Sequence, residues 1–292
     1  MSPVLQPVIP FYNDELTQGY FARIGYFQAG VDVGRVCRFF DLARADFHSG
    51  NNKCIEVVAA ISGEDAGRLK RNGIQKLSDN TLMLRGETLG LPVVRRVTTQ
   101  FCPRCLAADQ EADPSLGSAA WRFRWSWLLK PVVVCPDHNI ALVSVPAKDP
   151  VAAFDLRKLS AQNHLDLAPF EDLDPLSPGP LQRYVMSRIA DDVRASPWLD
   201  EQGIAAVVRT CETVGSLICD GPTAEINSYS ELDRARVGSA GFDVCSRGSS
   251  AILEALSEVR LGAGRRSGRT GPQAADAGEG ASPQRVRRAR LG

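Results

Sequence analysis

Residues 101–105 read FCPRC, and residues 135–138 read CPDH. Each motif holds two metal-binding side chains separated by two residues, a spacing that lets one tight turn bring both to the same ion. Proline follows the first cysteine in both motifs, where its fixed φ angle suits such a turn. The sequence therefore predicts one zinc ion held by four side chains, those of Cys102, Cys105, Cys135 and His138.

Four ligands predict a structural zinc site, because a catalytic zinc normally keeps three and leaves one position for water. Zinc deaminases also need His-x-Glu before Pro-Cys-x-x-Cys, and His48, the histidine upstream here, is followed by Ser-Gly. Two alternatives stay open. The pairs are a chance occurrence, or Cys102 and Cys105 form a redox dithiol, which leaves Cys135 and His138 unexplained. No catalytic residue is predicted.

Two longer segments surround the motifs, FCPRCLAADQ at 101–110 and AWRFRWSWLLKPVVVCPDHNIALV at 120–143. They resemble the TniQ family, which includes transposon target-selection proteins of the TnsD kind. Members show a Cys-Pro-x-Cys-Leu knuckle, then an aromatic strand, then Cys-Pro-x-His. The segment 15–30 also resembles the family's N-terminal helix, with Arg23 at its arginine. Many members carry a further Cys-Pro-x-Cys after the histidine. Residues 143–148 contain no cysteine, so a second zinc site is not expected there.

The resemblance implies an accessory protein of DNA transposition. Such a protein would link target-site recognition to an AAA+ ATPase and the transposase, so DNA, directly or through a partner, and that ATPase are the expected partners. The alternative is a stand-alone zinc-dependent DNA-binding regulator. Neither an enzyme activity nor a small-molecule substrate is expected. Four basic residues are candidates for phosphate contacts, although a solvated face is an equally good interpretation: Arg95, Arg96, Arg122 and Arg124.

Apolar periodicity predicts a mainly helical chain with a small β-ribbon zinc module, α+β overall. Residues 80–100 look extended. Residues 121–129, WRFRWSWLL, alternate aromatic with polar side chains and predict a half-buried strand. Helices are expected at 14–30, 33–45, 62–73, 180–195, 200–219, 231–240 and 249–259. The sequence GFDVCSRG at 241–248 is interpreted as a turn between the last two helices.

The 292 residues have a net charge of zero, but the charges are unevenly distributed. Residues 1–150 carry 17 Lys and Arg against 15 Asp and Glu, residues 151–260 carry 10 against 17, and residues 261–292 carry 7 against 2. Together with composition, this pattern predicts four parts. They are an N-terminal helical domain (1–100), a zinc-ribbon module (101–145), a C-terminal helical domain (146–260) and a disordered basic tail (261–292).

The N-terminus has no basic start followed by an apolar core, so a secretory signal is not expected. No apolar run reaches the roughly 18 residues that span a bilayer. A cytoplasmic location without membrane contact is therefore predicted. In that reducing compartment the eight cysteines stay free or bind metal.

Overall fold

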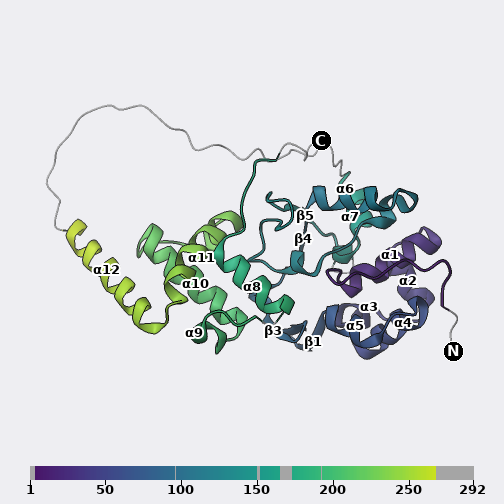
Figure 1. Cartoon of the computed structure of the whole chain (residues 1–292), viewed down its shortest axis with the longest axis horizontal. Helices are drawn as coiled ribbons and strands as arrows, with labels where there is room; N and C mark the ends of the chain where they lie inside the picture. The colour runs from purple at the N-terminus through teal and green to yellow at the C-terminus, as the bar shows by residue number, and fades with distance from the viewer. Residues whose placement is uncertain (1–3, 96, 150–151, 165–172, 192, 268–292) are drawn as a thin grey trace.

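The computed structural model describes residues 4–95, 97–149, 152–164, 173–191 and 193–267 (Figure 1). Short N-terminal helices occupy one end of the molecule, and the C-terminal helices occupy the other. Two small antiparallel sheets lie between them, one with strand order β1-β2-β3 and one with order β4-β5. The expected class, mainly helical α+β, is confirmed.

Five helices precede the first sheet: α1 (Thr17–Ala29), α2 (Val33–Phe39), α3 (Arg44–Ser49), α4 (Asn52–Ser62) and α5 (Ala66–Asn72). The expected helix at 14–30 is confirmed as α1. The expected helix at 33–45 is instead divided, because Asp41 adopts a left-handed φ of 48° and separates α2 from α3. Ser62 ends α4 rather than capping the next helix, and the Asp65 carboxylate caps α5 by accepting from the Arg68 amide.

Strands β1 (Gln75–Ser78), β2 (Thr81–Leu84) and β3 (Glu87–Gly90) form an antiparallel meander. A short 3-10 turn, η1 (Leu91–Val93), separates this meander from β4 (Thr98–Phe101). The last strand, β5 (Val143–Pro146), pairs with β4 so that Phe101 lies opposite Val143. The expected extended region at 80–100 is therefore largely confirmed, with η1 as its interruption.

The predicted strand at 121–129 is wrong. Its centre is a 3-10 helix, η3 (Trp125–Leu128), and single bridges join Arg124 to Glu15 and Leu129 to Val94. The alternation suggested a solvent face for the polar residues, but Arg124 and Ser126 are buried beside the aromatic residues. Because the protein covers both sides of this segment, the alternation of apolar and polar residues does not favour a strand over a 3-10 helix here.

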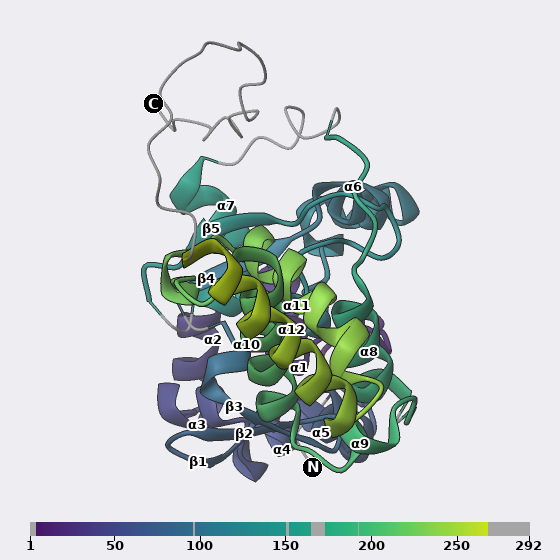
Figure 2. The same ribbon diagram turned by 90° about the vertical axis from the view of Figure 1, so that its left-hand side faces the viewer.

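The remaining helices are α6 (Pro103–Ala112), α7 (Leu156–Asn163), α8 (Pro180–Asp191), α9 (Pro197–Asp200), α10 (Ile204–Asp220), α11 (Glu231–Cys245) and α12 (Ser249–Ser267). Figure 2 shows α12 lying across α10 and α11. The expected helices at 180–195, 200–219 and 249–259 are confirmed as α8, α10 and α12. Helix α11 continues to Cys245, so the turn predicted at 241–248 is confined to its last three residues.

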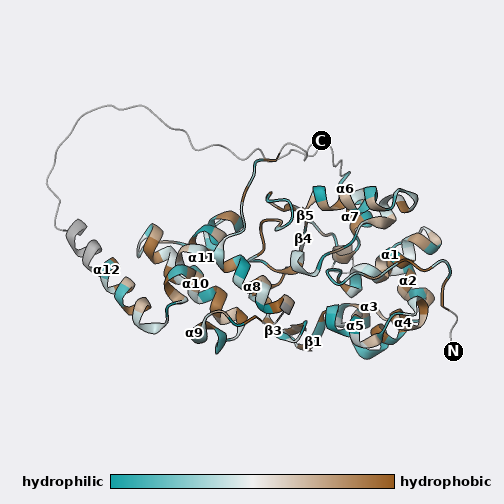
Figure 3. Ribbon diagram, viewed as in Figure 1, coloured by the Kyte–Doolittle hydropathy of each residue, from teal (hydrophilic) through white to brown (hydrophobic). Residues whose placement is uncertain are grey.

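The predicted tail begins later than position 261, because α12 includes residues up to Ser267. The rest of that tail, 268–292, lies outside the described residues. One hydrophobic core cluster includes residues from Ile9 to Cys245 and contains the three cysteines of the two motifs. Figure 3 shows apolar and polar residues alternating along most of the helices. The four-part division stays a prediction. No helix in the described part is long and apolar enough to cross a membrane.

Glycine explains why α10 and α11 pack so closely. A methyl group on Gly215 of α10 would lie 1.7 Å from the carbonyl oxygen of Val237, and one on Gly241 of α11 would lie 1.8 Å from that of Cys211. Both distances are far below van der Waals contact, so only a hydrogen atom fits. Gly241, interpreted above as a turn residue, therefore serves helix packing.

Gly215→Ala is expected to lower the free energy of unfolding by about 2 to 3 kcal/mol, because the helices must separate to admit the methyl group. Chemical denaturation of the full chain measures this change. Gly203→Ala is the matched control, since the cap position of the same helix has nothing within 4 Å of an added methyl group. Equal stability of the two variants would contradict the packing argument.

Candidate metal centre

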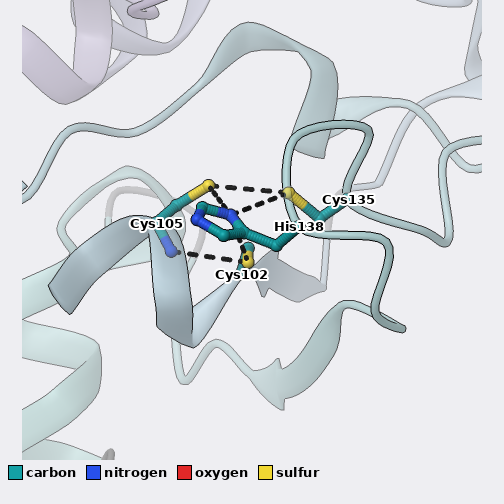
Figure 4. Close-up of side chains that lie close together, drawn as sticks. All are labelled: Cys102, Cys105, Cys135 and His138. Atoms are coloured by element: carbon teal, nitrogen blue, oxygen red, sulfur yellow. Dashed lines mark hydrogen bonds between the residues drawn. The ribbon is translucent and has the colours of Figure 1, made fainter. Parts of the chain in front are cut away.

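Cys102, Cys105, Cys135 and His138 converge in the structure, with all their ligand atoms within 4.8 Å of one another (Figure 4). The Sγ atoms of Cys105 and Cys135 lie 3.5 Å apart. The His138 Nδ1 atom lies 3.6, 3.3 and 3.5 Å from the Sγ atoms of Cys102, Cys105 and Cys135, respectively. Residues from two motifs 30 positions apart therefore face one point, with Nδ1 as the imidazole ligand atom.

The first motif lies at a junction between a strand and a helix. Strand β4 ends at Phe101, and Cys102 is the N-cap of α6, where its Sγ atom accepts a hydrogen bond of 3.4 Å from the Cys105 amide. Pro103 occupies the first helical position, which its φ angle favours and where no amide donor is required. The knuckle is thus a capped helix N-terminus in which both thiols lie on the same side.

The second motif is a tight turn closed by backbone hydrogen bonds. The Asn139 amide donates to the Cys135 carbonyl, and the Cys135 amide donates to the Ile140 carbonyl. Asn139 has a left-handed φ of 50°, a conformation that asparagine tolerates better than most residues. The turn therefore returns His138 towards the thiol of Cys135, and the pairing of β4 with β5 holds the two motifs together.

The arrangement fits a four-coordinate zinc ion. With metal–sulfur bonds of about 2.3 Å, a tetrahedron has edges of about 3.8 Å, and the measured separations are slightly shorter. All three cysteines are buried and His138 is half-buried, so protein encloses the site almost entirely. Soft thiolate and imidazole donors favour zinc among the common divalent ions. These four residues can hold a metal ion, and they leave no ligand position for substrate.

Hydrogen bonding within the group alters the acidity of its thiols. Bonds from Cys102 and Cys105 lower the pKa of Cys135 to about 2. Hydrogen bonds with Cys102 and Cys135, together with burial, raise the pKa of Cys105. These directions favour ionisation at Cys135, and a zinc ion would bind all three cysteines as thiolates.

A buried carboxylate connects the first motif to the aromatic segment, residues 121–129. Asp109 on α6, whose side chain is 1% exposed, accepts hydrogen bonds from Arg122 at 2.5 Å and from Arg124 at 2.8 Å. Asp14 lies on the other side of both guanidinium groups, at 3.2 and 3.4 Å. Burial alone would lower the pKa of Arg124, but Asp109 outweighs burial and raises it. The charge of Arg124 offsets part of the rise in the pKa of the Cys105 thiol.

The candidate DNA-contacting arginines occupy different surroundings from those expected. Arg95 is buried, donates to the carbonyl oxygens of Leu129 and Lys130, and forms a 3.3 Å ion pair with Glu231. Two others are the partners of the buried carboxylate, so a phosphate would have to replace an existing partner in each case. Arg96 lies outside the described residues. A role of these side chains in DNA binding stays a prediction.

A second buried ion pair was not found by sequence reasoning. Arg23 on α1 contacts both carboxylate oxygens of Glu15 at 2.9 and 2.8 Å, and both side chains are at most 1% exposed. The rings of Tyr12 and Tyr20 lie over its guanidinium carbon at 5.7 and 5.4 Å. The sequence did contain a signal for this pair. Arg23 lies on the apolar side of a predicted helix, and a buried arginine needs an acidic partner.

The family comparison covers this whole region, since the TniQ family model matches residues 7–142. The match includes α1, with the Arg23 pair, and all four residues of the metal centre. Over residues 7–142 the chain is therefore similar to the TniQ family. Among curated proteins, none matches the chain. This similarity associates residues 7–142 with transposition, and the central features of the matched region are the Cys3His group and the ion pairs around it.

Asp109→Ala is expected to lower the free energy of unfolding by about 3 kcal/mol, because Arg124 would remain buried without its main partner. Denaturant titration of the full chain measures the change. Glu111→Ala removes an exposed carboxylate from the same helix and is expected to change stability by less than about 0.5 kcal/mol. Equal stability of the two variants would show that the ion pairs of Asp109 do not stabilise the fold.

Proposed function

We propose that Cys102, Cys105, Cys135 and His138 bind one structural zinc ion in the TniQ domain. Three thiolates and a neutral imidazole give a divalent ion a net charge of −1, and Arg124 is the buried cation whose charge acts on Cys105. A bound zinc ion would cross-link the two motifs. The chain itself positions the ligands through the α6 cap, the turn at 135–140 and the β4–β5 pair.

The protein that contains this domain is proposed to be a non-catalytic accessory factor of transposition. It would link recognition of a target site on DNA to an AAA+ ATPase and, through it, to the transposase. The observation that carries this proposal is the TniQ match over 7–142, which contains the closed four-ligand centre. The second candidate is a stand-alone zinc-dependent DNA-binding regulator, which the same centre would serve equally well.

The charge distribution supports a division of roles between the two ends of the molecule. Residues 151–260 carry 17 acidic against 10 basic residues, whereas residues 1–150 carry a slight basic excess. Because negative charge repels phosphate, the C-terminal helices are proposed to offer a protein-binding surface. The N-terminal helices and the metal module would face DNA or a protein bound to it.

Purified protein is expected to contain about one zinc ion per chain, as a closed four-ligand site requires. Cys135→Ser should remove most of the metal and unfold the surrounding turn, since metal binding in such sites contributes on the order of 10 kcal/mol to folding. Elemental analysis and circular dichroism measure both effects. Cys219→Ser, at an exposed thiol on α10, is the control and should retain the metal. Metal-free protein with unchanged stability would contradict the assignment.

The transposition role predicts a complex with an AAA+ ATPase encoded beside this gene. The full chain should co-elute with that ATPase in the presence of ATP and duplex DNA, and removal of zinc by a chelator should abolish co-elution. Absence of such a gene, or separate elution of zinc-loaded protein, would favour the stand-alone regulator instead. Zinc content of the eluted protein distinguishes a failed interaction from a misfolded sample.

A further inference from the structure

Most arginine side chains of the N-terminal half are already engaged within the protein. Their partners are carboxylates or backbone carbonyls, and the set comprises Arg23, Arg68, Arg71, Arg85, Arg95, Arg122 and Arg124. Three arginines near α2 differ from this set. Arg35, Arg38 and Arg44 are exposed, and among the described residues no hydrogen bond or ion pair involves their guanidinium groups.

These arginines surround the most exposed large apolar side chain of the described part. Phe39 is 80% exposed, and its ring contacts Phe40 edge-on at 4.9 Å between centroids. Arg35, Arg38 and Phe39 are spaced i, i+3 and i+4 on α2, so they share one face of the helix. The opposite face is buried through Val33, Val36 and Cys37.

Arg44 completes this surface from the first turn of α3. Its Nη2 atom lies 3.9 Å from where a methyl group on Gly34 would stand, so it lies beside the first turn of α2. We call the four side chains Arg35, Arg38, Phe39 and Arg44 the α2 face. It lies at the N-terminal end of the molecule, away from the acidic C-terminal helices (Figure 1).

Three carboxylates lie near the α2 face, and each has a structural partner. Asp32 caps α2 by accepting from the Arg35 amide, and Asp46 accepts from the Ala43 amide at the start of α3. Asp41 lies 3.9 Å from the ammonium group of Lys53. The arginine side chains are therefore available to an external anion. A fourth carboxylate, Asp149, accepts a hydrogen bond from the Ala152 amide, and the positive charge of Arg44 contributes to lowering its pKa.

We propose that the α2 face binds DNA that presents an unpaired base. Arg35, Arg38 and Arg44 contact successive phosphates, and Phe39 stacks on the base. Guanidinium groups suit phosphate because they offer planar paired donors, and an exposed aromatic ring accepts the π-face of any base. An acidic protein partner would account for the arginines but gives no specific role to an exposed aromatic ring. The proposal rests on the association with DNA proposed above and locates it away from the metal centre.

The test measures binding of the full zinc-loaded chain to a fluorescent 20-nucleotide single strand and to the duplex of the same sequence. Fluorescence anisotropy is recorded between 50 and 300 mM salt. The triple variant R35A/R38A/R44A is expected to bind the single strand at least 30-fold more weakly. The slope of log affinity against log salt should fall by about 2, since each lost phosphate contact removes about 0.7.

Phe39→Ala separates stacking from charge. It should weaken single-strand binding about 10-fold, within the range measured for one stacked base, and change duplex binding less than twofold. The salt slope should stay unchanged, because no phosphate contact is lost. An equal effect on both DNA forms would overturn the stacking part and identify the ring as a contact to the duplex backbone.

A matched control removes the same charge from the C-terminal helices. R209A/R247A/R260A replaces three exposed arginines there and should change affinity less than threefold. Unchanged zinc content and melting temperature are expected for every variant, because the replaced side chains are exposed. Removal of residues 268–292 shows whether that basic segment supplies the affinity.

If the triple variant at the α2 face bound DNA as tightly as the wild-type chain, this location would be wrong while association with DNA would stand. The same conclusion would follow if removal of 268–292 abolished binding and the triple variant did not weaken it. If the wild-type chain bound neither DNA form, the α2 face and direct DNA association would both be wrong. The co-elution experiment with the ATPase tests the proposed transposition role separately.

Discussion

Three thiols and one imidazole converge within 4.8 Å, and much of the surrounding chain is arranged to hold them there. The cap of α6 orients two thiols, the turn at 135–140 returns the imidazole to the third, and the β4–β5 pair joins the two motifs. Three cysteines and one histidine with ligand atoms this close together have the composition and the spacing of a four-ligand zinc site. The local fold is therefore intelligible as a metal-binding scaffold.

Buried ion pairs extend this scaffold into the rest of the domain. Asp109 lies one turn beyond Cys105 on α6 and forms ion pairs with both Arg122 and Arg124, so it connects the first motif to residues 121–129. The Glu15–Arg23 pair joins α1 to the residues that precede it, and the Glu15 backbone bridges to Arg124. Removing either acid would leave a buried guanidinium group without its partner, which makes these pairs indispensable to the geometry rather than optional surface contacts.

The arginines illustrate why charge in a sequence does not identify a binding surface. Arg124 and Arg38 have the same side chain, and both lie near aromatic residues in the sequence. The first is 7% exposed and held by Asp109, whereas the second projects from a helix face beside an exposed phenylalanine. Only the position of a partner carboxylate far along the chain separates the structural arginine from the available one.

The four candidate metal ligands could be predicted from the sequence, because each pair depends on two residues three positions apart and on the proline that follows the first of them. The main helices followed from apolar periodicity for the same local reason. Tertiary packing decided what local patterns could not. It turned WRFRWSWLL into a buried 3-10 segment, since both faces are covered, and it continued α11 through Gly241, since α10 approaches too closely for a side chain. The Asp109 and Glu15 partners, and hence which arginines face solvent, also depend on contacts between segments distant in the sequence, which no short-range pattern records.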